Sequence, residues 1–241
     1  MNTKRHYIKV SGLQVEVVRK AIKNLHLGVY PPAGRVRVAV PTRVDDEAVR
    51  LAVISKLGWI RRQQTRFADQ PRQSQREMIA GESHYFQGRR YRLRIVEENA
   101  APKVRIGGST LKLSVRPDTD AAKREAVLND WYRGGLKTVL LDLIAKWQPI
   151  VGVEVAGWGV KKMKTKWGTC NANAGRIWLN LELAKKPVQC LEYIVVHEMT
   201  HLLERNHNDR FKELMNRFMP QWRLYRDELN RAPLAHETWS Y

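Results

Sequence analysis

The residues with the clearest chemical potential lie between Val196 and His207, where the sequence reads V-H-E-M-T-H-L-L-E-R-N-H. On a helix, His197 and His201 stand one turn apart, so both imidazoles project from the same face. Two neutral imidazoles at this spacing can hold one Zn²⁺, and Glu198 can face a water in the remaining position. The pattern predicts a metal-activated water with a carboxylate to take its proton, which is the arrangement of a metalloprotease.

The alternative reading is a chance pair of surface histidines, and the neighbouring residues argue against it. Apolar residues occupy most of the circumference of this helix: Leu191, Ile194, Val195, Val196, Met199, Leu202 and Leu203. Two histidines and a glutamate inside such a helix would be costly without partners, and a metal ion supplies the partner. We therefore expect one Zn²⁺ per chain, bound by His197, His201 and a third ligand.

We expect the third ligand to be His207. Asn206 can adopt the left-handed conformation that ends a helix, and Asn208-Asp209 can cap a following helix. His207 would then lie in a tight turn between two helices, where a ligand is held rigidly. The alternative ligands are carboxylates further along the chain, which would otherwise form a solvated helix face: Glu213, Asp227 and Glu228.

The length and composition favour an ordinary globular protein. The 241 residues allow one large domain or two small ones, and a hydrophobic share of 43% with 8 Trp is enough for a sizeable core. The sequence contains no apolar run of membrane-spanning length, and residues 1–10 lack the apolar segment of a signal peptide. We therefore expect a cytoplasmic protein without a membrane partner, in which Cys170 and Cys190 are free thiols.

The net charge of +19 is unevenly distributed. Residues 1–150 carry 29 Lys and Arg against 14 Asp and Glu, a balance of +15, whereas residues 151–241 carry 14 against 10, a balance of +4. This favours contact of the first part with a polyanion. Because the cations are scattered and not clustered, solubility explains them equally well. Non-specific binding of DNA or RNA is therefore a hypothesis only.

The hydrophobic patterns predict a chain that mixes helices and strands. A strand at 35–41 is followed by a helix at 45–66 that opens on Asp45. Turn residues are dense at 28–34, residues 15–27 fit either type, and residues 69–80 resemble a linker. Further along we expect these elements: hairpins at 85–96 and 104–115, a long helix at 118–147 ended by Pro149 and Gly152, and a hairpin within 160–181. No internal repeat is visible.

Three segments resemble the YgjP-like family of predicted zinc metallopeptidases. They are residues 163–170 (MKTKWGTC), residues 177–180 (IWLN), and residues 195–207, which contain the histidines. Residues 38–41 and 59–60 and the pair Gly88 and Tyr91 fit the same pattern, so the resemblance covers nearly the whole chain. The departures are small: Thr169 and Asn171 stand where the family tends to have serine, and Met199-Thr200 replace a leucine-alanine pair.

The resemblance implies an α+β fold with His197, His201 and His207 as metal ligands. A zincin-like catalytic domain, with its HExxH helix packed on a small mixed sheet, would follow an N-terminal α+β region. We place these parts at residues 81–241 and 1–80, unless they form one continuous domain. At the motif level the family is related to SprT-like and Wss-like proteases, which act on proteins attached to DNA.

In zincins an extended peptide adds to the edge strand beside the metal helix. We expect residues 176–181 to be that strand, with Trp178 and Asn180 binding substrate, although an ordinary core strand explains the segment too. Other residues have weaker assignments. We expect Trp167 and Cys170 to be packing residues. Lys164 and Lys166 should be solvated or contact a substrate carbonyl or phosphate. Tyr193, Tyr225 or Arg210 could stabilise the transition state.

The leading hypothesis is therefore a zinc-dependent peptidase that acts on protein or peptide substrates, with Glu198 as the general base. The alternative is a basic nucleic-acid-binding protein with a mainly structural metal site. Such a site needs a fourth protein ligand, for example Cys170 or a downstream carboxylate. An intact Glu198 favours catalysis, because a structural site does not need it. A protease recruited to DNA would combine the two.

Overall fold

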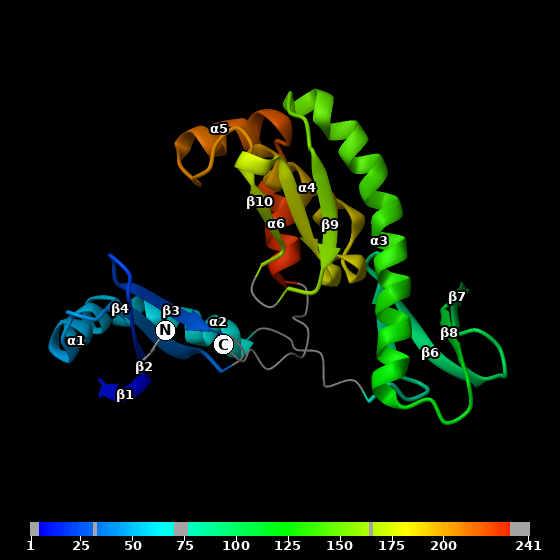
Figure 1. Ribbon diagram of the computed structural model, residues 1–241, viewed down its shortest axis with the longest axis horizontal. Coiled ribbons are helices and arrows are strands. Elements are labelled where there is room, and N and C mark those ends of the chain that lie inside the picture. Colours follow the sequence, from blue (N-terminus) through cyan, green and yellow to red (C-terminus); the bar gives the residue numbers. More distant parts are fainter. Residues whose placement is uncertain (1–4, 31–32, 70–76, 164–165, 232–241) are drawn as a thin grey trace. The chain divides into compact units, whose positions relative to one another are not determined.

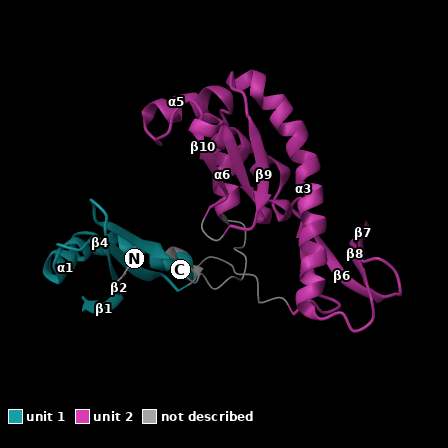
Figure 2. Cartoon of the chain, viewed as in Figure 1, with its two compact units in different colours: residues 1–72, 237–241 teal, residues 73–236 magenta. Residues whose placement is uncertain are grey.

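The computed structural model describes residues 5–30, 33–69, 77–163 and 166–231 (Figure 1). The chain forms two compact units, the first within residues 1–72 and the second within residues 73–236 (Figure 2). The functional division expected between residues 1–80 and 81–241 stays a prediction. No helix in the described ranges combines the length and the apolar character needed to cross a membrane.

The first unit is a four-stranded sheet with two helices. Its elements are β1 (Arg5–Val10), β2 (Leu13–Lys20), β3 (His26–Tyr30), β4 (Arg35–Pro41), α1 (Asp46–Ser55) and α2 (Leu57–Asp69). The sheet order is β1-β2-β4-β3, with β2 parallel to β4 and both outer strands antiparallel to their neighbours. Its core consists mainly of valines. They come from alternate positions of β2 and β4, whose side chains share one face of the sheet, and from α1.

The strand predicted at 35–41 is confirmed, and two other predictions for this unit need correction. The turn-rich break expected at 28–34 is wrong at its start, because residues 28–30 belong to β3. The helix expected at 45–66 begins as predicted, with the Asp45 carboxylate accepting from Ala48 N at 2.8 Å. It does not continue unbroken, because Lys56 ends α1 and α2 begins immediately afterwards.

The second unit begins with another four-stranded sheet, followed by a long helix. Its elements are β5 (Ser83–Phe86), β6 (Arg89–Glu97), β7 (Lys103–Gly107), β8 (Thr110–Val115) and α3 (Ala121–Val151). Both predicted hairpins are confirmed, and the first turns at Gln87 and Gly88, as expected. Asp120 caps α3 by accepting from Lys123 N at 2.8 Å, and Gly152 ends it in the left-handed conformation. Pro149 lies inside the last turns of the helix and does not end it.

The two four-stranded sheets share one topology, although the sequence shows no repeat. The second sheet has the order β5-β6-β8-β7, with β6 parallel to β8 and both outer strands antiparallel, as in the first sheet. Each sheet is followed by a helix with an aspartate cap, Asp45 in one case and Asp120 in the other. The chain therefore contains the same strand-and-helix arrangement twice.

The remaining elements form the layer that carries the histidines. They are β9 (Gly157–Lys161), β10 (Gly168–Asn171), β11 (Arg176–Asn180), α4 (Val188–Thr200), α5 (Asp209–Phe218) and α6 (Trp222–Arg231), with short 3-10 helices at Ala172–Ala174 and Leu181–Lys185. Helix α4 packs on β10 and β11 and is flanked by α3, α5 and α6 (Figure 1). The α+β class and the HExxH helix on a small mixed sheet are both confirmed.

One topological prediction in this layer is wrong. The sheet order is β10-β11-β9, with β11 antiparallel to β10 and parallel to β9. Strand β11, which covers most of residues 176–181, is therefore the central strand and cannot accept a further peptide. The edge strand beside α4 is β10.

Candidate metal centre

Helix α4 is buried along most of its length, which fixes the direction of its last side chains. Val195, Val196 and Met199 have no exposed surface. The helix ends at Thr200, and His201 occupies the C-cap position with ordinary right-handed backbone angles. The chain turns at once through residues 201–203, so the expected left-handed Asn206 is wrong: its φ is not positive.

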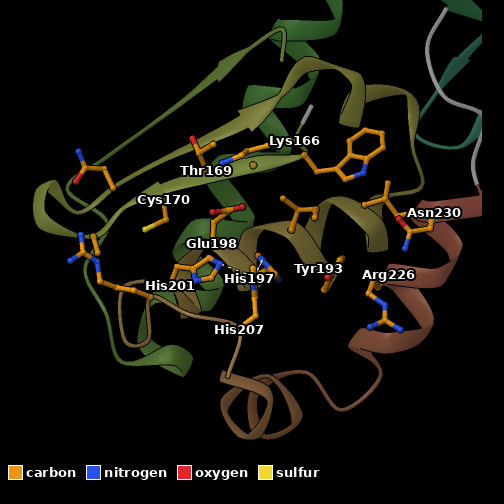
Figure 3. A pocket seen from close by; sticks show the side chains of 17 residues that line it. Lys166, Thr169, Cys170, Tyr193, His197, Glu198, His201, His207, Arg226 and Asn230 are labelled. Atoms are coloured by element: carbon orange, nitrogen blue, oxygen red, sulfur yellow. Dashed lines mark hydrogen bonds between the residues drawn. The ribbon is translucent and has the colours of Figure 1, made fainter. Parts of the chain in front are cut away.

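The turn after α4 brings His207 back to the two helix histidines. The Nε2 atom of His207 lies 3.0 Å from that of His197 and 3.1 Å from that of His201. Figure 3 shows the three imidazoles converging below Glu198. Two Zn–N bonds of about 2.0–2.1 Å at a tetrahedral angle separate their nitrogens by about 3.3 Å, so the observed spacing suits one zinc-sized ion.

The surroundings hold the imidazoles in the form that binds a metal. His201 Nδ1 lies 3.0 Å from the carbonyl of Glu204, so Nδ1 carries the proton and Nε2 offers its lone pair. Burial, with smaller effects of the other two histidines, lowers the pKa of His197 to about 3, and burial also lowers the pKa of His201. Both rings are therefore neutral at physiological pH, as metal ligands must be.

Phe211 packs against all three histidine rings. Its ring centroid lies 5.0 Å from that of His197, 4.7 Å from that of His201 and 4.8 Å from that of His207. Asn208 caps α5 by accepting from the Phe211 backbone N–H at 2.9 Å, as the sequence predicts. This cap fixes the start of α5, and with it the ring on which the imidazoles pack.

The alternative ligands lie elsewhere. Among the described residues, the group of potential ligand atoms within 4.8 Å of one another here contains only the three histidines. Asp227 pairs with Arg226 at 3.0 Å, and the Glu228 carboxylate accepts from Gln189 at 3.2 Å. Cys170 lines the same pocket but is not a member of the ligand group. The described chain thus offers three ligands and no fourth.

Glu198 is the buried carboxylate of the site. It is 5% exposed and lies between β10 and the histidines (Figure 3). Burial raises the pKa of Glu198 to about 8, and the positive charge of Lys166 opposes this shift. A carboxyl group with this pKa can both accept and release a proton near neutral pH.

The site opens into a cavity of about 880 Å³. One wall is the segment from Lys166 to Ala172, which includes β10, and the floor is the face of α4 that carries Tyr193, His197 and Glu198. Arg205 and residues of α6 complete the lining. Sequence reasoning missed Gly168, Arg205, Arg226 and Asn230, because no local pattern links them to the histidines.

The two residues expected to bind substrate lie outside this lining. Trp178 is on the central strand, and Lys161 lies over its ring at 4.9 Å. Asn180 is buried, and its side-chain amide donates to the carbonyls of Met163 at 2.9 Å and Lys166 at 2.8 Å. Asn180 thus holds the loop before β10, and its substrate-binding role, like that of Trp178, stays a prediction.

Of the three candidates for transition-state stabilisation, only Tyr193 lines the cavity; Tyr225 and Arg210 do not. Tyr193 precedes His197 by one helical turn, and their rings make an edge contact with centroids 5.7 Å apart. Burial raises the pKa of Tyr193 to about 12, so the hydroxyl keeps its proton and remains a hydrogen-bond donor.

Cys170 and Cys190 are both free. Burial, with a smaller effect of Glu198, raises the pKa of Cys170 to about 11, and Arg205 opposes the shift. The Cys170 thiol is therefore protonated and unreactive at neutral pH. It packs against the unit's core, as the sequence predicts, while also lining the cavity. Lys164 lies outside the described residues.

Two converging helix histidines, a third histidine from the following turn and a buried adjacent glutamate are the pattern typical of metal-dependent hydrolases with an HExxH motif. Within that class, the model of the YgjP-like metallopeptidase-domain family matches residues 23–232, and the chain belongs to this family. Among solved structures, the chain is similar to the metallopeptidase zymogen of Pyrococcus abyssi abylysin. The identity is 19%, the TM-score is 0.34, and the match covers 36% of this chain and 89% of that one. No curated protein matches the chain.

Proposed function

We propose that this metallopeptidase is a zinc enzyme in which His197, His201 and His207 bind the metal and Glu198 is the general base. The observation that carries the proposal is the convergence of three imidazole nitrogens beside a buried carboxylate. Three imidazoles suit Zn²⁺ well and leave a coordination position open, as catalytic zinc sites require. A cytoplasmic location stays a prediction.

The residues of the site have separate roles in the proposed reaction. Zn²⁺ bound by these imidazoles would polarise a substrate carbonyl and lower the pKa of a water. Glu198 then accepts the proton of the attacking water and returns it to the leaving amine. The Tyr193 hydroxyl, which keeps its proton and lines the same cavity, is the candidate donor to the carbonyl oxygen.

The substrate backbone is positioned by β10. This strand is the edge of its sheet and lines the cavity along its whole length. An extended peptide that adds to β10 would lie over the histidines and bring one carbonyl to Glu198. Asn180 donates hydrogen bonds to the carbonyls of Met163 and Lys166, which precede β10, and these bonds help to fix the position of β10 over α4.

A nucleic-acid-binding protein with a structural metal remains the alternative, and the structure provides little for it. A fourth ligand is missing among the described residues near the histidines. Two of the basic side chains of β4 also form salt bridges within the protein and are less available to phosphate groups. The guanidinium nitrogens of Arg35 and Arg37 lie 3.7 and 3.9 Å from Oε2 of the buried Glu16. Anisotropy titrations with duplex DNA at two salt concentrations distinguish the two functions, because phosphate contacts weaken steeply as salt rises.

The decisive experiment compares wild type with Glu198→Gln, using a library of fluorogenic peptides and measured zinc content. We expect the variant to keep about one zinc per chain and to lose hydrolysis, since an amide cannot act as a general base. Glu213→Gln, exposed on α5 and outside the cavity lining, is the matched control and should retain activity. Equal hydrolysis by wild type and Glu198→Gln would overturn the proposed mechanism.

A further inference from the structure

The cavity over the histidines has an unequal distribution of charge. Among the described residues that line it, the cations are Lys166, Arg205 and Arg226, whereas the single carboxylate is Glu198. Glu198 is 5% exposed, while Lys166 and Arg205 are exposed and the Arg226 side chain is 43% exposed. Among the side chains that line the cavity, the accessible formal charge is therefore positive.

Two of these cations lie at opposite ends of the cavity. Arg205, from the turn after α4, acts electrostatically on Cys170, and Arg226, on α6, acts on Tyr193. Figure 3 shows Cys170 and Tyr193 on opposite sides of the histidine cluster. The two guanidinium groups therefore flank the position at which the reaction takes place.

The third cation lies on the wall of the cavity that contains β10. Lys166 precedes β10 and acts electrostatically on Glu198 and His201 (Figure 3). The three cations thus come from three segments around the cavity in which a peptide on β10 would lie, and a bound zinc ion would add to their charge.

Most of this positive charge is not neutralised by neighbouring carboxylates and can interact with a bound molecule. Lys166 and Arg205 form no salt bridge with any residue in the described part of the chain. Arg226 contacts its neighbour Asp227 at 3.0 Å and lies 5.1 Å over the ring of Trp222. Asp227 is itself 49% exposed, so it only partly neutralises the Arg226 guanidinium.

We propose that the enzyme selects acidic peptides, with Asp or Glu side chains on both sides of the bond to be cleaved. This inference rests on the proposed peptidase function and adds its substrate class. One exposed ion pair raises affinity about 2- to 5-fold, so two or three such pairs give about tenfold selection. The selection weakens as salt rises, because exposed charges are screened.

Binding tests the selection without requiring catalysis. Two rhodamine-labelled peptides, blocked at both ends, differ only in Glu or Gln at the positions flanking the central bond, so that any difference in affinity comes from the Glu carboxylates. We expect the full-length, metal-free protein to bind the Glu peptide about tenfold more tightly at low salt. Arg205→Glu should weaken binding of the Glu peptide about fivefold, whereas Arg217→Glu, exposed on α5 outside the cavity, should not change it.

Two binding results would overturn acidic selection. One is equal affinity of wild type for the Glu and Gln peptides, and the other is equal loss of affinity in Arg205→Glu and Arg217→Glu. Displacement of both peptides by duplex DNA, without preference between them, would assign the positive charge to nucleic acid instead.

Cleavage by the zinc-loaded protein separates this inference from the proposed function. We expect kcat/KM for the Glu peptide to exceed that for the Gln peptide about tenfold. Cleavage of both peptides at equal kcat/KM would confirm the peptidase and overturn acidic selection. Preferential binding of the Glu peptide, with no cleavage of either, would overturn the peptidase and leave acidic selection standing.

Discussion

Gly168 and Glu198 are in such close contact that any side chain at position 168 would force Glu198 to move. A Cβ atom built on Gly168 would lie 2.5 Å from Glu198 Oε1 and 2.8 Å from its Cδ atom. Gly168 is the first residue of β10, and Glu198 projects from α4 beneath that strand. The absence of a side chain on β10 therefore leaves the space that the buried carboxylate occupies.

We predict that Gly168→Ala lowers kcat by about tenfold or more, because the added methyl group displaces Glu198 from the position at which it takes a proton. Zinc content should stay near one per chain, since the ligands are not touched. Gly157→Ala, on β9 of the same sheet, is the matched control, because its nearest neighbour is a flexible arginine side chain 3.5 Å away. An equal decrease of kcat in both variants would contradict a specific effect on Glu198.

We predict that His207→Ala binds far less zinc than wild type, because only two imidazoles remain. Chelation should lower the melting temperature of wild type, since zinc bound to the native state stabilises it, and should leave the variant unchanged. Elemental analysis and thermal unfolding with and without chelator measure both effects. His26→Ala, exposed on β3, is the control; full zinc content in His207→Ala would exclude His207 as a ligand.

Asn180→Ala should lower the free energy of unfolding by about 1–3 kcal/mol, because backbone groups of Met163, Lys166 and Glu182 lose their partner. Urea denaturation measures the change, with Asn99→Ala, exposed between β6 and β7, as the control. Unchanged stability combined with a raised KM would contradict this positioning role and support the substrate contact expected from the sequence.

Lys186 makes the free energy of unfolding depend on pH in the alkaline range. Burial lowers its pKa from 10.5 to about 8, and Glu182 opposes the shift. Between these two values the native state has lost the proton and the unfolded state still binds it, so stability rises with pH across that window. Below about pH 8 both states are protonated, and the native state carries the full cost of the buried charge.

Lys186→Met should therefore stabilise the protein at pH 7, by at most about 3 kcal/mol, and this gain should disappear as the pH approaches 10.5. Denaturant unfolding of wild type and variant at several pH values measures the difference. The exposed Lys137→Met controls for the loss of a surface charge. A stability difference that is constant with pH would contradict the assignment to Lys186.

Local features of the fold could be predicted because they depend on residues close in sequence. The helical period alone places His197 and His201 on one face, and the aspartate and asparagine caps at Asp45 and Asn208 need contacts only three residues away. Hairpins with short turns, such as the one at Gly88, belong to the same group.

The repeated topology shows why long-range order is not visible in the sequence. The two parallel pairs, β2 with β4 and β6 with β8, form through backbone hydrogen bonds, which any side chain permits. Valines fill the core beside one sheet, whereas leucines and aromatic residues fill the core beside the other. The two sheets therefore share a topology without sharing a recognisable sequence.

The sequence by itself determined which groups the site contains: two histidines one helical turn apart, a neighbouring carboxylate and a third histidine within reach of a turn. The tertiary structure decided which strand is free and what surrounds the carboxylate. Strand β9 pairs with β11 and leaves β10 at the edge, and β10 brings Gly168 to Glu198 from a distant part of the chain. Strand order and contacts between elements depend on how whole layers pack, and no local spacing encodes them.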